Sequence, residues 1–384
     1  MSPSIRVLTV ITRLELGGAQ RVALHTASHL DRESFEPGLA WGPGEVLDDE
    51  ARAFDDVARF EINDLVRPVA PLKDLRALAK LRASIRQFRP HVVHTHSSKA
   101  GVLGRLAARL EHVPAVVHTV HGFGFTPLQS PVKRAGFFRA EKMAARWTDH
   151  FVAVSRVNRD RGVELGLWKP DQVSVIRAGV DLDRFRAPGD GRETRRQLGV
   201  PDGVPVVTQI GNFKPQKAPL DFIAAAAQIA ERMPEVQFIM VGDGPLRGEA
   251  QNRAAELGLA DRVIFCGWWD DVPGLLAATT VSVLSSHHEG LPCSVVESLA
   301  AGVPVVATAV DGTPEVIRPG VNGELVAPGD PAGLAAAVHA ILIDDERRQS
   351  MAAAAADGLD DFGRDHMVRE LEELYQWMVG SNPC

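Results

Sequence analysis

The chain has 384 residues, of which 45% are hydrophobic and 24% charged, as in ordinary soluble globular proteins. A chain of this length predicts two domains. It has no apolar run of roughly 18 residues, which argues against a membrane-spanning helix, and the first apolar run, VLTVI, is too short for a signal peptide. The net charge of −7 and the lack of a recognition motif argue against a nucleic acid partner.

The cysteine pattern indicates the cellular compartment. Cys266, Cys293 and Cys384 are spaced for neither a disulfide framework nor a zinc site. We therefore expect a reducing, cytoplasmic setting.

Charge is divided unequally along the chain. Residues 1–187 carry 28 Lys and Arg against 21 Asp and Glu, a net charge of +7. Residues 188–384 carry 14 against 28, a net charge of −14. The basic first half predicts contact with anionic partners. Undirected charge variation between domains is the alternative.

Short apolar runs alternate with longer amphipathic segments in the first half of the chain. Strands are predicted at 6–12, 91–96, 115–121, 150–155 and 173–179, and helices at 17–30 and 99–110. The alternation of strand and helix predicts a parallel sheet covered on both faces.

Residues 187–205, rich in Gly, Pro and charge, predict the domain boundary, with a short helix in RETRRQLG. Beyond them, strands are predicted at 206–211, 236–242, 262–267, 281–286 and 303–308, and helices at 344–358 and 364–379. We expect an α/β protein with two doubly wound Rossmann-like domains, 1–187 and 188–364, that face each other across a cleft. A C-terminal helix in 365–384 is expected to cross back to the first domain. Ligands of such sheets bind at the carboxyl ends of the strands.

The segment HHEGLPCSVVESLAAG, residues 287–302, places Glu289 and Glu297 eight positions apart around a helix start. The preceding strand, VSVLSS, ends where the loop begins. Free backbone N–H groups from Gly290 to Ser294 suit a phosphate or another anion. The two carboxylates suit hydroxyl groups, so the set fits a sugar–diphosphate–nucleoside. Ordinary solvent-exposed glutamates are the alternative.

Histidines and glycines follow the strands of the first domain. His121 ends the strand AVVHTVH and is expected to project from its carboxyl end, with His118 on the opposite side. His94 and His96 share one strand face. That spacing can bind metal, but no carboxylate or cysteine companion accompanies it, so no metal site is expected. Buried, hydrogen-bonded histidines are the alternative for His118 and His121.

Two further turns are candidates for ligand contact. Gly17 and Gly18 occupy the first β–α turn, where glycine lets a backbone approach a ligand closely. Ser97, Ser98 and Lys99 follow the strand 91–96 and are candidates for contact with a ligand phosphate or for a plain helix cap. GDGPLRG (242–248) has one residue too many for a dinucleotide-binding loop, which argues against a dehydrogenase.

Two basic stretches carry apolar side chains. Residues 70–90 read as a cationic amphipathic helix, and residues 130–147 combine cations with Phe137, Phe138 and Trp147. Such helices suit an anionic lipid surface. Packing of the apolar face against the protein interior is the alternative.

The ordered motifs resemble retaining glycosyltransferase family 4, of GT-B fold. EGLPCSVVE (289–297) is similar to the E-x7-E signature of that family. GGAQR, VHTVHGFGF, VSRVNRD, IGNFKPQKAPLDFI, VGDGPLR and DGTPEVI stand around it in the expected order. HTHSSKAGVLGRLAA (94–108) is similar to members that build bacterial surface polysaccharides. The resemblance covers nearly the whole chain.

This resemblance implies roles for individual residues. Glu289 would bind donor-sugar hydroxyls and stabilise charge near the reacting carbon, Glu297 would bind the ribose, and Lys217 would neutralise the diphosphate. His121 would lie beside the donor sugar. Further expected donor contacts are Gly17, Gly18, Asn212, Gly290, Leu291, Cys293 and Ser294, and expected acceptor contacts are Ser98 and Lys99.

The chain departs from the family pattern at Asn212, where many relatives carry arginine. Asn donates a hydrogen bond without supplying charge, and Lys214 is the nearby cation that could compensate. The resemblance implies metal-independent chemistry without a cofactor, because Lys217 and helix amides would neutralise the phosphates.

Taken together, the motifs predict a hexosyltransferase. It would move a sugar from a nucleotide-diphosphate sugar, expected to be UDP-linked, to a hydroxyl of a saccharide or polyprenyl-linked acceptor, with retention of configuration. It would work in the cytoplasm at the inner face of the membrane. A sugar-nucleotide epimerase of the same fold and a non-catalytic nucleotide-sugar- or polysaccharide-binding protein are the alternatives.

Overall fold

The computed structural model describes residues 4–126, 128–187 and 189–381, so Cys384 lies outside the described residues. The chain forms two compact units. Unit 1 comprises Met1–Gly179 and Arg364–Cys384, and unit 2 comprises Val180–Gly363. The chain therefore passes between the units twice.

The division lies eight residues before the boundary expected at 187/188. The segment after Gly179 belongs to unit 2 because its contacts are there. Val180 forms a parallel bridge with Gly363, Arg184 donates to the carbonyl of Asp270, and Arg186 pairs with Asp360 at 2.7 Å. The residues that join the units are thus 179–180 and 363–364 rather than the Gly- and Pro-rich stretch.

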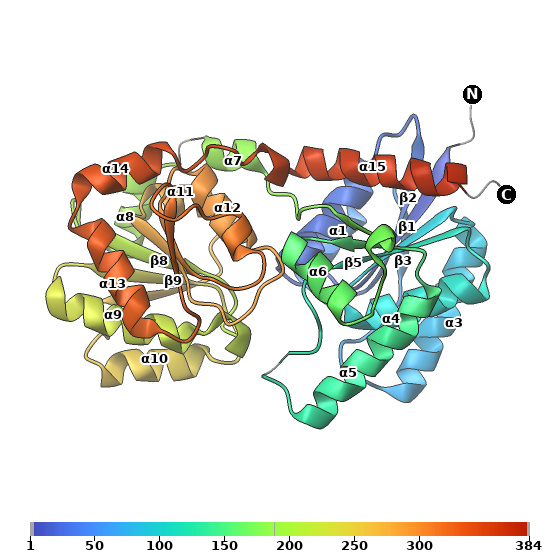
Figure 1. Ribbon diagram of the computed structural model, residues 1–384, viewed down its shortest axis with the longest axis horizontal. Helices are drawn as coiled ribbons and strands as arrows, with labels where there is room; N and C mark the ends of the chain where they lie inside the picture. The colour runs from blue at the N-terminus through green and yellow to red at the C-terminus, as the bar shows by residue number, and fades with distance from the viewer. Residues whose placement is uncertain (1–3, 127, 188, 382–384) are drawn as a thin grey trace. The chain divides into compact units, whose positions relative to one another are not determined.

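Unit 1 is built on a seven-stranded parallel sheet with the order β3-β2-β1-β4-β5-β6-β7 (Figure 1). Its strands are β1 (Ile5–Arg13), β2 (Phe35–Gly42), β3 (Ala58–Glu61), β4 (Val92–His96), β5 (Ala115–Val120), β6 (His150–Ala153) and β7 (Val173–Val175). Its helices are α1 (Gly18–His29), α2 (Asp48–Arg52), α3 (Pro71–Phe88), α4 (Ser98–Leu110), α5 (Pro131–Ala144), α6 (Arg156–Glu164) and α15 (Arg364–Ser381), with short 3-10 turns η1 (Ala145–Trp147) and η2 (Pro170–Gln172).

Alternation along the strands gives this sheet two buried faces. Val93 packs in a core with residues of α3 and α4, whereas its neighbour His94 faces the other way. A separate core on the other face joins Ile11, Leu39 and Trp41 to α1. Both faces are therefore covered, as expected for a parallel sheet.

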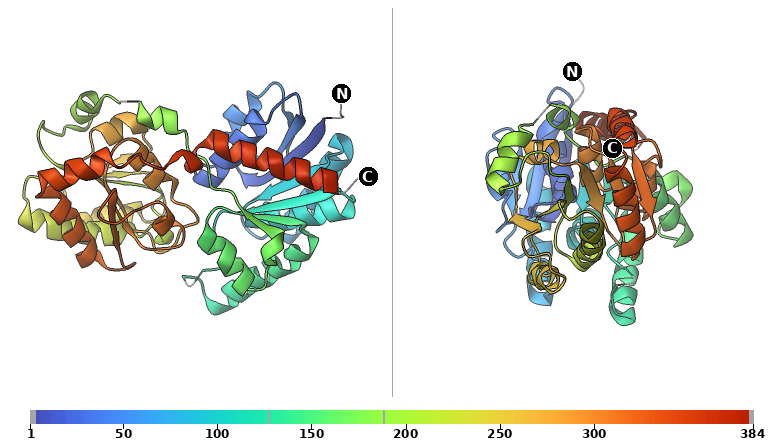
Figure 2. Two further views of the ribbon diagram at one scale, coloured as in Figure 1. Left: turned by 45° about the horizontal axis from the view of Figure 1, so that its top comes forward. Right: turned by 90° about the vertical axis from the view of Figure 1, so that its left-hand side faces the viewer.

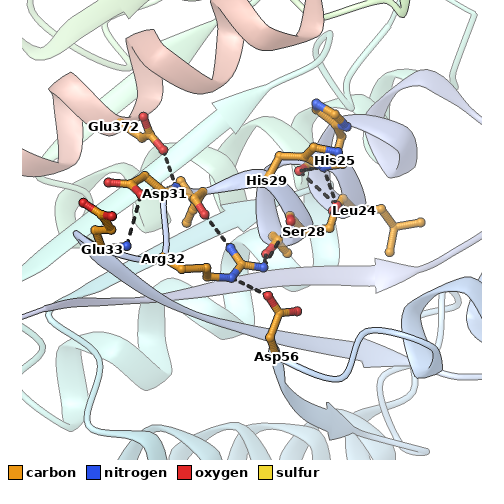
Figure 3. Close-up of polar contacts among 11 residues, drawn as sticks. Leu24, His25, Ser28, His29, Asp31, Arg32, Glu33, Asp56 and Glu372 are labelled. Atoms are coloured by element: carbon orange, nitrogen blue, oxygen red, sulfur yellow. Dashed lines mark hydrogen bonds and ion pairs between the residues drawn. The ribbon is translucent and has the colours of Figure 1, made fainter.

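The C-terminal helix α15 belongs to unit 1. It lies alongside α1, as the left view of Figure 2 shows. Glu372 accepts a hydrogen bond from the backbone N–H of Asp31 at 2.7 Å, beside the Arg32–Asp56 ion pair (Figure 3). Tyr375, fully buried, hydrogen-bonds His94 of β4 at 2.5 Å. The last helix thus completes the cover of a sheet built by the first half of the chain.

Unit 2 has a six-stranded parallel sheet with the order β10-β9-β8-β11-β12-β13. Its strands are β8 (Val206–Ile210), β9 (Gln237–Val241), β10 (Val263–Gly267), β11 (Val281–Leu284), β12 (Val305–Thr308) and β13 (Gly323–Val326). Its helices are α7 (Leu182–Arg186), α8 (Gly191–Leu198), α9 (Pro219–Arg232), α10 (Arg247–Glu256), α11 (Val272–Ala277), α12 (Cys293–Ala300), α13 (Pro331–Leu342) and α14 (Asp345–Ala353), with 3-10 turns η3 (Pro215–Lys217), η4 (Thr313–Glu315) and η5 (Asp360–Phe362). The helix expected in RETRRQLG is α8.

Three strands were not predicted. β2 contains Pro37 and Gly38, both weak strand formers, yet most of it is buried between β1 and β3. β3 and β13 have four residues each and lie at sheet edges. Short edge strands carry too little alternation to stand out in a sequence. Over the described ranges, every helix is too short or too polar to cross a bilayer.

Candidate active site

A tight turn after β8 positions Lys217. The turn η3 ends at Lys217, and Ala218 then takes the left-handed conformation with φ 44°. Ser285 Oγ and Gln209 Nε2 donate to the Lys217 carbonyl at 3.0 and 3.2 Å. These bonds fix the backbone, so that the ammonium is directed at the loop after β11.

Glu289 lies in that loop and is 6% exposed. Its Oε1 accepts from Lys217 Nζ at 2.5 Å and from Ser286 Oγ at 2.6 Å. Within residues 4–126, 128–187 and 189–381, Glu289 Oε2 meets no hydrogen-bond donor. One oxygen of this carboxylate is therefore fixed by the protein, and the other has no donor within the described ranges.

Asp311 holds the backbone of Glu289, a role that the sequence analysis missed. Its Oδ2 accepts a hydrogen bond from the Glu289 N–H at 2.6 Å, and Gly312 N–H donates to the Gly290 carbonyl at 3.2 Å. Asp311 itself has φ 42°, in the left-handed region. The one signal in the sequence was the Asp311-Gly312 pair after a predicted strand. Such a pair indicates a turn with positive φ, because Asp tolerates that conformation better than most residues.

The helix α12 follows the Glu289 loop. It begins at Cys293 after Pro292, with Ser294 in its first turn, and Glu297 lies one turn inside it, as expected. Leu291 is buried, so its side chain packs in the protein. The backbone N–H groups of Gly290, Leu291, Cys293 and Ser294 remain predicted ligand contacts, whereas Pro292 has none to offer.

The loop containing Asn212 packs against the turn after β9. The Phe213 N–H donates to the Asp243 carbonyl at 3.0 Å, and Gly242 has φ 122°. A Cβ at Gly242 would lie 2.3 Å from the Gly211 carbonyl oxygen, so this approach requires glycine. Asn212 stays a predicted donor contact.

In unit 1, His121 hydrogen-bonds His96. His96 Nδ1 and His121 Nε2 lie 2.9 Å apart, and His96 is fully buried while His121 is partly exposed. His118 faces the other side of β5 and hydrogen-bonds Thr95 at 2.8 Å. His118 thus has the buried structural role, and His121 keeps an accessible edge.

Gly17, Gly18, Ser98 and Lys99 lie at two helix starts of unit 1. Gly17 caps α1, which begins at Gly18, and α4 begins at Ser98. The Lys99 ammonium pairs with Asp74 at 2.6 Å and also contacts the Pro68 carbonyl. This side chain is therefore engaged within the protein, and its acceptor role stays a prediction.

Comparison with known proteins identifies the family. Residues 16–184 match the family described as Glycosyltransferase Family 4, and residues 190–357 match Glycosyl transferases group 1. The chain is 34% identical over 319 residues to the UDP-Gal:alpha-D-GlcNAc-diphosphoundecaprenol alpha-1,3-galactosyltransferase of Escherichia coli, covering 81% of each chain. The chain belongs to glycosyltransferase family 4. This glycosyltransferase is also 32% identical over 318 residues to a 2-deoxystreptamine N-acetyl-D-glucosaminyltransferase of Streptomyces fradiae, covering 80% of this chain and 75% of that one.

Solved structures confirm the GT-B fold of the glycosyltransferase. Anabaena HepE in complex with UDP-glucose superposes with a TM-score of 0.84 at 24% identity, covering 97% of this chain and all of that one. WaaG, a glycosyltransferase involved in lipopolysaccharide biosynthesis, superposes with a TM-score of 0.77 at 17% identity. The match covers 96% of this chain and 99% of that one. The expected pair of Rossmann-like domains is therefore confirmed.

The two thiols in the described part of the chain, Cys266 and Cys293, are poor nucleophiles. Burial, with a smaller contribution from the nearby charge of Glu297, raises the pKa of Cys293 to about 12. Burial likewise raises the pKa of Cys266 to about 11. Both thiols stay protonated near neutral pH, and the thiolate is the reactive form. In the part of the chain that is described, we find no cluster of three or more His, Cys, Asp or Glu arranged for a metal ion.

Proposed function

We propose that this glycosyltransferase moves a hexose from a UDP-sugar to a hydroxyl of a polyprenyl-linked or saccharide acceptor, with retention, in cell-surface polysaccharide synthesis. The Lys217–Glu289 arrangement carries the proposal: a fixed cation lies beside a carboxylate with one oxygen left for a ligand. The name of the Escherichia coli relative, with UDP-galactose and a diphosphoundecaprenol acceptor, supports the substrate classes.

The chemistry follows from charge development at the anomeric carbon. As the bond from that carbon to the diphosphate oxygen breaks, Lys217 stabilises the growing negative charge on the leaving group. Glu289 Oε2 accepts from sugar hydroxyls, and Glu297 accepts from the ribose. The acceptor oxygen bonds to the same face of the carbon, and its proton passes to the departing diphosphate oxygen. No metal or cofactor takes part in this scheme.

Ligand-induced stabilisation tests the donor site. Melting temperatures of wild type, Glu297→Ala and the exposed control Glu249→Ala are measured with UDP, GDP, ADP, their common sugars and NAD. A ligand at 100 times its Kd adds about 2.7 kcal/mol of stability. We expect UDP and a UDP-sugar to raise the melting temperature of wild type and the control, but not of Glu297→Ala.

Product analysis separates the alternatives. If no nucleotide stabilises any of the folded proteins, the donor-site assignment is wrong. If the stabilising sugar nucleotide is converted to its epimer without an acceptor, the epimerase is correct. If a sugar nucleotide binds but is neither cleaved nor epimerised with any hydroxyl acceptor tested, the protein is a non-catalytic nucleotide-sugar-binding protein.

We propose further that α3 and α5 rest on the inner, cytoplasmic face of an anionic membrane. Both helices pack against α4 in unit 1. Leu72 and Leu75 of α3 are 74% and 65% exposed among Lys73 and Arg76, and Val132 of α5 is 84% exposed beside further cations. Exposed apolar side chains within a basic surface suit anionic lipid.

Vesicle sedimentation tests this surface. Wild type should pellet with vesicles that contain phosphatidylglycerol and not with pure phosphatidylcholine. Leu72→Glu with Val132→Glu should abolish pelleting without altering the melting temperature, because both side chains are exposed. Unchanged pelleting of the double variant would show that another surface binds the lipid.

A further inference from the structure

His96 lies fully buried beside His121, and its two ring nitrogens are in different situations. Its Nδ1 is 2.9 Å from His121 Nε2. Its Nε2 is buried and meets no hydrogen-bond partner among residues 4–126, 128–187 and 189–381. The ring of His94 lies tilted against that of His96, with 4.3 Å between centroids, but both His94 nitrogens are bonded elsewhere, to Tyr375 and Thr119.

The contact between the two rings requires one proton. Burial lowers the pKa of His121 to about 4 and that of His96 well below its ordinary value, so both rings are neutral near pH 7. A neutral imidazole carries its proton on one nitrogen and a lone pair on the other. Either His96 Nδ1 donates to His121 Nε2, or the reverse holds.

The buried Nε2 of His96 decides between these alternatives. If His121 donated, His96 would carry its own proton on Nε2, and a buried N–H would have no acceptor. An unpaired buried donor costs about 1–3 kcal/mol, and such donors are rarer in proteins than under-used acceptors. If His96 donates from Nδ1, its Nε2 keeps only a lone pair. The second arrangement is the more stable one.

We propose that His96 is a positioning residue that fixes His121 in the tautomer with its proton on Nδ1. His121 then accepts from His96 at Nε2 and donates from Nδ1. That Nδ1 has no hydrogen-bond partner in the described part of the chain, and it is not among the buried unpaired atoms, so a ligand can reach it.

The tautomer determines what His121 recognises. A neutral N–H donor selects an oxygen lone pair, on a hydroxyl, ring or phosphoryl oxygen, and rejects another N–H. This step rests on the proposed function, from which it follows that the ligand of His121 is the nucleotide sugar. His121 therefore supplies a hydrogen bond without adding positive charge.

Nitrogen-15 NMR of imidazole-labelled protein tests the tautomer without any substrate. Protonated and unprotonated ring nitrogens have well-separated shifts, and His121→Gln and His96→Asn assign the two rings. At pH 7 we expect both rings to carry their protons on Nδ1. In His96→Leu, His121 should return to the Nε2-protonated form. A wild-type His121 protonated on Nε2 would overturn the proposal.

Matched variants separate positioning from folding. Asn places an amide N–H near the position of His96 Nδ1, so His96→Asn should retain the His121 tautomer if His96→Leu fails to fold. His118→Asn removes a buried histidine from the opposite face of β5 and should leave His121 unchanged. A shift of the His121 tautomer in His118→Asn would assign the effect to general loosening of the sheet.

Calorimetric binding of UDP and UDP-glucose tests the consequence. His96→Leu should weaken UDP-glucose by about threefold to tenfold, the value of one hydrogen bond, and leave UDP unchanged. His96→Asn should restore the affinity. If wild type binds neither ligand, the donor assignment fails while the NMR result still decides the tautomer. If the tautomer is as proposed but His96→Leu binds UDP-glucose as wild type does, His121 does not contact the sugar.

Discussion

In unit 2 the candidates Lys217 and Glu289 are held by charge, whereas in unit 1 the candidate His121 is held by a hydrogen bond between neutral rings. Lys217 and Glu289 form an ion pair with a carboxylate, Asp311, fixing the backbone. His96 and His121 are joined by a hydrogen bond, His94 lies beside His96, and burial keeps each of these rings neutral. The difference is that unit 2 fixes its candidate side chains by charge, whereas unit 1 fixes His121 without any charge. The two should therefore fail under different perturbations.

The largest expected effect is loss of charge in unit 2. Glu289→Gln leaves Lys217 without its anionic partner and removes the strongest hydroxyl acceptor of the site. We expect kcat/KM to fall by about 10²–10³, the usual cost of one electrostatic contact in a transition state. The rate of transfer is measured with the nucleotide sugar that stabilises wild type. Glu249→Gln, an exposed residue of α10, is the control, and equal rates for both variants would contradict the role of Glu289.

Acidification should affect unit 1 first. In the unfolded chain these imidazoles bind protons near pH 6.5, whereas burial lowers the pKa of His94 to about 3 and that of His121 to about 4. Unfolding takes up protons in this window, so stability is complete above pH 6.5 and declines as the pH falls toward 4. The loss should be on the order of 3 kcal/mol for each ring at pH 4.

Hydrogen exchange measured by mass spectrometry, corrected for the intrinsic pH dependence, resolves the two units. Peptides of β4 and β5 should lose protection between pH 7 and 5 before peptides of β11 and β12 do. Loss of protection at the same pH in both units would mean that protonation of the buried imidazoles does not destabilise unit 1 before unit 2.

Tyr375→Phe tests the hydrogen bond that joins α15 to His94 of β4 in unit 1. It leaves His94 Nδ1 buried without its partner on α15, so the free energy of unfolding should fall by about 1–3 kcal/mol. Exchange in α15 should rise, because the hydroxyl ties this helix to β4. The control Ser298→Ala removes a buried hydroxyl pair with Ser282 in unit 2 and should leave α15 unchanged. Equal exchange of α15 in both variants would show that packing alone holds the helix.

The smallest expected effect concerns Asp311. Asn keeps both the acceptor and the tolerance for positive φ, so Asp311→Asn should remain within about 1 kcal/mol of wild type. Asp311→Gly removes the oxygen that accepts from the Glu289 N–H. Asp311→Ala removes the same oxygen and also places a Cβ on a backbone with positive φ, which is strained. We expect Ala to be less stable than Gly by about 1 kcal/mol in urea unfolding. Transferase activity should fall in Asp311→Gly and Asp311→Ala but not in Asp311→Asn. An equal loss of activity in all three variants would show that the charge of Asp311 matters rather than its hydrogen bond.

The sequence predicted most of the fold because short apolar runs alternate regularly with longer amphipathic segments. It did not predict β2, whose Pro37 and Gly38 contradict a strand in the absence of tertiary contacts. Glu289 was singled out by its place before a helix start and Lys217 by the resemblance, while their direct contact, across 72 positions, emerged only in the fold. The roles of Asp311 and His96 depend on a left-handed φ and on a buried neighbour 25 positions away, neither of which a local pattern encodes.

The double passage of the chain between the units has a consequence for biosynthesis. The strands of unit 1 leave the ribosome first, but Tyr375 and the rest of α15 follow only after the 184 residues of unit 2. At roughly 5–20 residues per second, this interval lasts about 10–40 s. During that time His94 and the face of β4 have no α15 to cover them. A growing chain stalled within unit 2 therefore presents an open apolar sheet, which a chaperone or a protease could bind before the enzyme is complete.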